Sequence, residues 1–225
     1  MFCRKKAIAL AAALFLIAGG CGLREYEDRL VQQQDRLDYI EKENKNLGAP
    51  VKFKARKEVK EGQTTKPAPN IFLRLPKGIP VEGAEAFPGS LLYCFNKDSS
   101  KPEGVDEVCI AGGKEEQFEK DVLAEIQKTR KLGEPRRQED KLPPPLDQEP
   151  LRFTAYSAID GKTPKSSYLI YFYENAGYHV AIVYRQQPAT DDSGKIAFDP
   201  RIDYSLKSLA VGAAAVQKRS QYRAP

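Results

Sequence analysis

Hydrophobic residues recur along this chain with different periods, and each period predicts a different element. An uncharged apolar run occupies residues 7–17. Over residues 23–47, apolar or seam-compatible residues recur at alternating spacings of three and four, the heptad pattern of a coiled coil. These residues are Leu23, Tyr26, Leu30, Gln33, Leu37, Ile40, Asn44 and Leu47. The pattern predicts a helical stalk over residues 21–47, which ends before Gly48 and Pro50. Fully helical, residues 22–47 would be about 39 Å long.

Two arrangements of this stalk remain open. In the first, residues 23–47 associate with another copy of the chain as a short coiled coil. Gln33 and Asn44 would weaken such an assembly because they place polar groups in the apolar seam, whereas Arg36 and Glu41 flank the seam where charges of neighbouring chains could pair. In the second, a single amphipathic helix folds back on its own globular domain or lies on a membrane surface.

The remaining chain predicts a flexible linker and then an α+β domain. Residues 48–70 are polar and basic without a sustained period, which is typical of a linker. Residues 71–215 are expected to form an antiparallel sheet with a middle helix and a C-terminal helix, followed by a polar tail at 216–225. The strand candidates are residues 71–76, 90–95, 105–111, 151–158, 167–173 and 178–185. Residues 174–177 should join the last two strands as a hairpin, and residues 167–173, apolar on both faces, should lie inside the sheet.

Two helices and one irregular loop complete this domain. Within residues 114–133, Phe118, Val122 and Ile126 share one helical face, with acidic residues in the first turn and basic residues in the last. The C-terminal helix is predicted from helical spacing. The residues that carry this spacing are Ile202, Leu206, Leu209, Ala210 and Ala213. Prolines make residues 134–150 a predicted surface loop without regular structure.

The apolar run at the N-terminus has the organisation of a secretory signal. Three cations, Arg4, Lys5 and Lys6, precede it, and Gly19 and Gly20 follow it. A basic segment, about eleven apolar residues and a small-residue exit are typical of a signal peptide. The run is too short for a transmembrane helix, which needs about twenty residues. Residues 1–20 are therefore predicted to be a signal peptide.

The end of this segment, Ala18-Gly19-Gly20-Cys21, resembles the lipobox of bacterial lipoproteins. The resemblance implies that the Cys21 thiol receives a diacylglyceryl group, that the chain is cut before Cys21, and that the new amine is acylated. Ala18 departs from the family pattern, which usually has leucine there, and this is expected to lower the efficiency of processing. Two or three acyl chains anchor a protein firmly, at about 0.8 kcal/mol per buried methylene. The implied location is the cell envelope, on a bacterial membrane and facing the periplasm or the exterior.

Removal of the signal changes the charge and the cysteine count. It takes three of the 36 Lys and Arg residues and none of the 31 Asp and Glu residues, so the net charge falls from +5 to about +2. A nearly balanced surface argues against a nucleic-acid partner. Cys3 leaves with the signal and Cys21 is lipidated, so Cys94 and Cys109 remain.

In an oxidising compartment these two cysteines predict one structural disulfide. A redox pair would more often have the Cys-X-X-Cys spacing, and two buried free thiols are the competing interpretation. A metal site is not expected, because His179 is the chain's one histidine and no second pair of Cys or His ligands exists. No cofactor is expected.

No catalytic residues emerge from the motifs. Residues 160–163 mimic the end of a phosphate loop, but Tyr156 stands where its first glycine is required. The tyrosine-rich strands offer one candidate ligand pocket. Its residues are Tyr171, Tyr173, His179 and Tyr184. A small-ligand-binding or hydrolytic domain built on them is the alternative function.

A hairpin-rich sheet closed by an amphipathic helix resembles the PsbP-like α+β family over residues 71–215. The resemblance is architectural, without a matched motif. Members of that family are often exported lipoproteins or accessory subunits, which implies a structural, assembly or partner-binding role without enzymatic activity. The sequence does not identify the protein partner.

Overall fold

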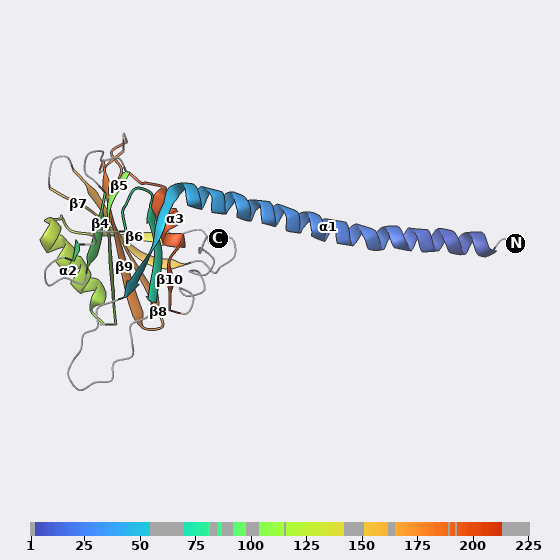
Figure 1. Ribbon diagram of the computed structural model, residues 1–225, viewed down its shortest axis with the longest axis horizontal. Coiled ribbons are helices and arrows are strands. Elements are labelled where there is room, and N and C mark those ends of the chain that lie inside the picture. The colour runs from blue at the N-terminus through green and yellow to red at the C-terminus, as the bar shows by residue number, and fades with distance from the viewer. Residues whose placement is uncertain are drawn as a thin grey trace, which may run out of the picture. The chain divides into compact units, whose positions relative to one another are not determined.

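The computed structural model divides the chain into two compact units, residues 1–45 and residues 46–225. Most of the first unit is helix α1, Cys3–Asn46, which contains the predicted stalk (Figure 1). None of the helices among the described residues combines the length and the apolar character that crossing a membrane requires. The structure describes residues 3–54, 70–81, 85–86, 92–97, 104–114, 116–141, 151–161, 165–188, 190–191 and 193–212.

Two antiparallel sheets and two helices make up the described part of the second unit, which confirms the predicted α+β class but gives two sheets where one was expected. The smaller sheet has the order β1-β2-β10, and the larger has the order β3-β4-β5-β9-β8-β7-β6. The strands of the smaller sheet are β1 (Leu47–Lys54), β2 (Asn70–Pro76) and β10 (Ala210–Val211). The strands of the larger sheet are β3 (Glu85–Ala86), β4 (Tyr93–Asn96), β5 (Gly104–Gly113), β6 (Arg136–Lys141), β7 (Arg152–Ile159), β8 (Ser167–Asn175) and β9 (Tyr178–Gln187).

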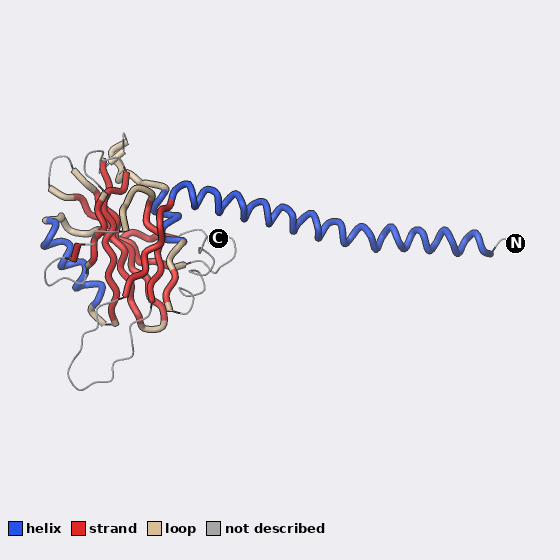
Figure 2. Tube along the Cα trace, in the orientation of Figure 1, coloured by secondary structure: helices blue, strands red, loops and turns tan. Residues whose placement is uncertain are grey.

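The central strands of the larger sheet are buried on both faces, and each face packs against different elements (Figures 1 and 2). Helix α2, Phe118–Arg130, covers one face. The smaller sheet and helix α3, Arg201–Lys207, cover the other. Strands β5, β8 and β9 therefore carry apolar residues on both sides, which explains their nearly continuous hydrophobic sequences.

The predicted middle helix and hairpin are confirmed. In α2 the buried residues are Phe118, Val122 and Ile126, the face expected from their spacing. Strand β8 lies inside the sheet between β7 and β9. Its turn into β9 has two residues with positive φ, Ala176 at 51° and Gly177 at 73°. Two such residues match the right-handed twist of a hairpin.

Part of the predicted linker is a strand instead. Residues 48–54 belong to β1, which pairs antiparallel with β2. Val51 is buried in the core and the adjacent Lys52 is exposed, so this short alternation has one apolar face despite its basic composition. Pro50 is tolerated because β1 is the edge strand of its sheet. Residues 55–69 lie outside the described residues.

The predicted irregular loop also contains a strand. Residues 136–141 form β6, which pairs with β7 along six residues at the edge of the larger sheet. The prediction for these residues was wrong because they contain no proline, so their backbone N–H groups are available to a neighbouring strand. Residues 142–150 lie outside the described residues.

The C-terminal helix is shorter than its spacing predicts. Helix α3 ends at Lys207, and Ala210 and Val211 pair as β10 with Phe72 and Ile71 of β2. The edge of β2 offers backbone partners to these residues, and Leu209 and Val211 still reach the core. Ala213 and the predicted tail at 216–225 lie outside the described residues.

Candidate functional site

The predicted disulfide is present between two paired strands. Cys94 of β4 lies directly opposite Cys109 of β5, and their Cα atoms are 4.0 Å apart. Both cysteines are buried on the face of the larger sheet that α2 covers. Cysteine counting and antiparallel pairing thus predicted this bridge correctly.

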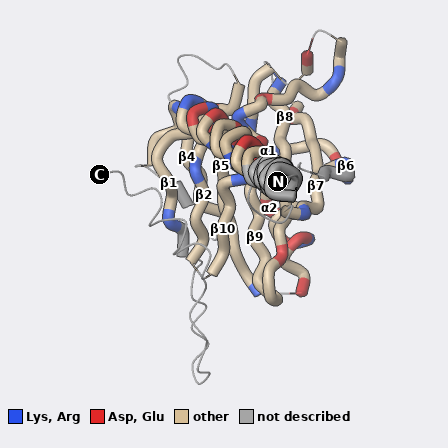
Figure 3. Tube along the Cα trace, turned by 90° about the vertical axis from the view of Figure 1, so that its right-hand side faces the viewer, with Lys and Arg blue, Asp and Glu red and all other residues tan. Residues whose placement is uncertain are grey.

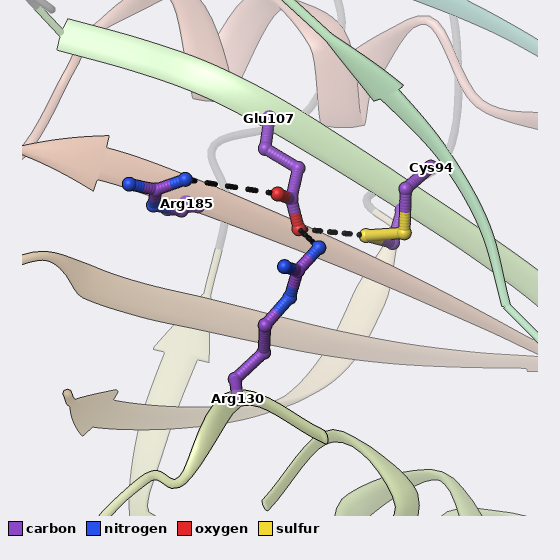
Figure 4. Close-up of a disulfide and its surroundings, with 5 residues drawn as sticks. Cys94, Glu107, Arg130 and Arg185 are labelled. Carbon is purple, nitrogen blue, oxygen red and sulfur yellow. Dashed lines mark hydrogen bonds and ion pairs between the residues drawn. A yellow bond between two sulfur atoms is a disulfide. The ribbon is translucent and has the colours of Figure 1, made fainter. Parts of the chain in front are cut away.

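A buried carboxylate lies against the bridge. Glu107 is two residues before Cys109 on β5 and points to the same side of the sheet. Its Oε1 is 3.2 Å from Cys109 Sγ (Figure 4). A disulfide sulfur carries no hydrogen, so this is a close contact and not a hydrogen bond. Strand β5 has an irregularity between Val105 and Glu107, which makes Asp106 an extra residue on this strand.

Two arginines from other elements converge on this carboxylate (Figure 4). Arg130, at the last turn of α2, donates from Nη2 to Glu107 Oε1 at 2.7 Å. Arg185 lies opposite Glu107 on β9, with Nη1 3.8 Å from Glu107 Oε2 and Nη2 3.7 Å from Asp106 Oδ2. Two carboxylates therefore face two guanidinium groups, and the charges of the cluster balance.

Burial dominates the titration of these carboxyl groups. It raises the pKa of Glu107 above the ordinary value of 4.5, although Arg130 and Arg185 act in the opposite direction. Burial likewise raises the pKa of Asp106, opposed mainly by Arg185. The nearby Tyr168 hydroxyl has a pKa of about 12, chiefly because of burial and secondarily because of the negative charge of Glu107. Desolvation is thus the largest electrostatic cost at this site.

The cluster suits a structural role more directly than a binding role. Cys94, Glu107 and Cys109 place one potential ligand atom each within 4.8 Å of one another, as a metal site would. However, the two sulfur atoms are bonded to each other and the carboxylate is paired with Arg130 and Arg185. If the bridge were reduced, the Cys109 thiol could donate its hydrogen to Glu107, because the two atoms are already in contact.

The residues of the predicted ligand pocket do not share one face of the sheet. Tyr171 and Tyr184 are buried in the core between the two sheets, and Tyr173 packs against that core. The Tyr184 hydroxyl donates to Ser205 Oγ of α3 at 2.8 Å. His179 instead stacks on Phe118 of α2 on the opposite face, with ring centroids 5.8 Å apart. Residues 179 and 184 are separated by an odd number of positions on β9, so their side chains alternate to opposite sides.

Sequence reasoning missed the charged cluster around the bridge. Its one local signal is the Asp106-Glu107 pair, which directly precedes Val108 and Cys109 in an otherwise apolar strand. Charged residues are rarely buried unless they are paired, so such a pair predicts cationic partners. Nothing local identifies Arg130 and Arg185 as those partners. Cys21 lies in α1, and its side chain is outside the described part of the structure.

Comparison with known proteins finds no family model that matches this chain and no curated protein with a significant sequence match. The resemblances to bacterial lipoproteins and to the PsbP-like family therefore remain predictions from the residues themselves.

Proposed function

We propose that this chain is an exported lipoprotein of the bacterial cell envelope, which holds an α+β domain at a membrane surface and binds or supports a protein partner there. The proposal begins with the basic, apolar and small-residue segments that converge on Cys21. Acyl chains on Cys21 would anchor the chain, since each buried methylene adds about 0.8 kcal/mol. The helix from residue 21 to Asn46 then leads directly into the first strand of the domain.

The observation that carries the binding role is an exposed apolar stripe on α1. Five side chains of the predicted seam are between 38% and 63% exposed. These are Leu23, Tyr26, Leu30, Leu37 and Ile40. Charged residues of both signs lie along the same part of the helix (Figure 3). An apolar stripe bordered by charges is typical of a protein-binding surface. The alternative, a ligand-binding or hydrolytic domain, has less support because its four residues divide between two faces of the sheet.

Substitution of Cys21 tests the anchor. In a bacterial host that processes lipoproteins, Cys21→Ala should release the chain from membranes or leave an uncleaved precursor, because no thiol can accept the lipid. Cys3→Ala is the matched control, since Cys3 would leave with the signal, and it should be processed like wild type. Membrane fractionation and intact-mass measurement provide the readouts. Unchanged cleavage and membrane retention of Cys21→Ala would overturn the proposal.

The partner-binding role needs its own experiment. The lipidated protein would be crosslinked in native membranes and purified, and the recovered proteins compared between wild type and Leu30→Glu/Leu37→Glu, which places charge on the stripe. We expect one specific partner, either another protein or a second copy of this chain, to be recovered with wild type and lost with the double variant. Equal recovery from both would contradict a role for the stripe.

A further inference from the structure

We infer that the apolar stripe of α1 binds a second copy of this chain as a parallel, in-register coiled coil over residues 23–44. The inference rests on the proposed function, because it names the partner of the stripe described above. It commits to one orientation and one register, which the seam residues and the charges beside them determine.

The seam has the composition of a short, weak coiled coil. Leu23, Leu30 and Leu37 recur every seven residues at the first seam position, and Asn44 follows at the next repeat. The leucines are exposed by 46% to 63% on the described helix, so their apolar surface is available. Helices without tertiary packing are marginally stable, and burial of this seam would stabilise the helix. A polar residue such as Asn44 at this seam position favours one register, because a shift would leave its amide against apolar side chains.

The charges beside the seam favour the parallel orientation. In a parallel pair, the residue that directly precedes the first seam position of a heptad faces the residue five positions later on the partner helix. This rule places Arg36 opposite Glu41 of the second copy, and the symmetric pair forms on the other side. The rule also places Arg29 opposite Gln34, which is uncharged. The parallel arrangement therefore contains two attractive pairs and no like-charge pair among these positions.

The antiparallel orientation brings like charges together. Aligning the seams in opposite directions places Glu27 beside Glu41 of the second copy and Arg36 beside its own equivalent. The compensating contact, Arg29 with Glu43, would form twice in the symmetric pair, against three like-charge contacts. A lipid on residue 21 of each copy would also hold both helix N-termini at the same membrane. Charge and anchorage thus point to the same orientation.

Cysteine crosslinking of the full chain in native membranes tests the inference. Each variant carries one new cysteine, at Leu23→Cys, Leu37→Cys or Val31→Cys, and a mild oxidant is added. Facing seam positions lie within the roughly 7 Å Cα separation that a disulfide allows. Leu23→Cys and Leu37→Cys should each give a species of twice the chain mass. Val31→Cys is the matched control, because Val31 is 59% exposed and lies one residue outside the seam, and it should crosslink at least tenfold less.

The outcomes separate the arrangements. Crosslinking at both Leu23→Cys and Leu37→Cys requires parallel, in-register helices, because antiparallel helices can bring like positions together at only one point of the seam. No crosslink, equal crosslinking at Val31→Cys, or a crosslink at only one seam position would overturn the inference. Equal crosslinking would reflect collisions at the membrane, and the absence of a crosslink would leave the stripe to the membrane surface or to another protein.

A charge-swap series adds a second readout, in which the new cysteine stays in place and only the charges beside the seam change. In the Leu37→Cys background, Glu41→Lys should lower the crosslinked fraction about two- to fivefold, because it replaces two exposed attractive pairs by repulsive ones. Adding Arg36→Glu should restore the fraction. Failure of the crosslinks while Cys21→Ala still releases the chain would overturn only the coiled coil. If the crosslinks form but Cys21→Ala is cleaved and retained at the membrane like wild type, only the lipid anchor is overturned.

Discussion

At the scale of single residues, a buried carboxylate beside the disulfide is paired with two partly exposed arginines, Arg130 and Arg185. Glu107 is 3% exposed and is paired with Arg130 at 2.7 Å. Removing one partner of a buried pair leaves the other charge uncompensated, whereas replacing both partners by apolar residues is much better tolerated. The cluster should therefore respond non-additively to mutation.

We predict that Glu107→Ala lowers the free energy of unfolding by about 1–3 kcal/mol, because Arg130 and Arg185 lose a charged partner but remain 20% and 29% exposed to water. Urea unfolding of the purified protein measures this loss. The exposed Glu174 supplies the control, because Glu174→Ala should change stability by no more than about 0.5 kcal/mol. The combined Glu107→Leu/Arg130→Leu variant should lose less than the sum of its single substitutions. A loss below about 1 kcal/mol for Glu107→Ala would contradict a stabilising role for its pairs with Arg130 and Arg185.

A second residue, Asp199, predicts how stability depends on pH. Its Oδ2 accepts from the Val105 N–H at 2.9 Å, and its carboxylate also accepts from the Arg201 side chain and backbone. Burial by itself would raise the pKa of Asp199, but these hydrogen bonds and the Arg201 charge lower the pKa below the ordinary 3.8 overall. The folded state therefore holds this carboxylate deprotonated more strongly than the unfolded state does. Its stabilisation is present above the unfolded pKa and is lost as the pH falls through the folded pKa.

Asp199→Asn should consequently be less stable than wild type by about 1–3 kcal/mol near pH 7, because hydrogen bonds to a charged group are lost. The difference should stay constant down to about pH 5 and shrink steadily below about pH 4. Urea unfolding of both proteins between pH 2.5 and pH 7 is the measurement. A difference that does not change with pH would mean that the charge of Asp199 does not contribute to folding.

At the scale of elements, α2 is attached to the sheet by one narrow apolar face. Ile126 is 1% exposed in the core beneath α2, and the next residue, Gln127, is exposed. Ile126→Ala should lower the free energy of unfolding by about 2–5 kcal/mol through lost burial and a cavity, while Gln127→Ala should have almost no effect. Thermal and urea unfolding compare the two. Similar losses at both positions would contradict a specific role for the packing of Ile126 in holding α2 in place.

At the scale of the whole molecule, the disulfide joins two cysteines that are 15 residues apart in the chain. A loop of this length corresponds to about 3 kcal/mol in the chain-entropy model. We predict that reduction lowers the free energy of unfolding by about this amount. Because both sulfur atoms are buried, reduction should require opening of the α2 face and should be slow in the native protein.

Thiol titration and urea unfolding, with and without reductant, test this prediction in a chain carrying Cys21→Ser without its signal. Unfolded but unreduced protein should show no thiol from Cys94 or Cys109, and the midpoint should fall after reduction. The Cys94→Ala/Cys109→Ala double variant should not respond to reductant. Two reactive thiols in the unfolded, unreduced protein would show that the bridge does not form.

The sequence by itself determined the elements whose information is local. The spacing of Phe118, Val122 and Ile126 determined the buried face of α2, and the apolar runs of residues 167–173 and 178–185 determined a hairpin inside the sheet. Period and turn residues suffice there because neighbours along the chain specify the conformation. Cysteine counting likewise predicted the bridge, since only one pairing was available. The predicted pocket grouped His179 with Tyr184, although strand alternation by itself places residues five positions apart on opposite faces.

Only the tertiary structure decided the edges and the charged cluster. Residues 48–54, 136–141 and 210–211 are strands because the open edges of β2 and β7 supply partners for their backbone groups, and no local pattern encodes a partner that is distant in sequence. Glu107 is buried for the same kind of reason: part of its desolvation cost is offset by Arg130 and Arg185, which the fold brings from α2 and β9. Pairing and charge compensation are properties of positions in space, so they appear only when the chain is folded.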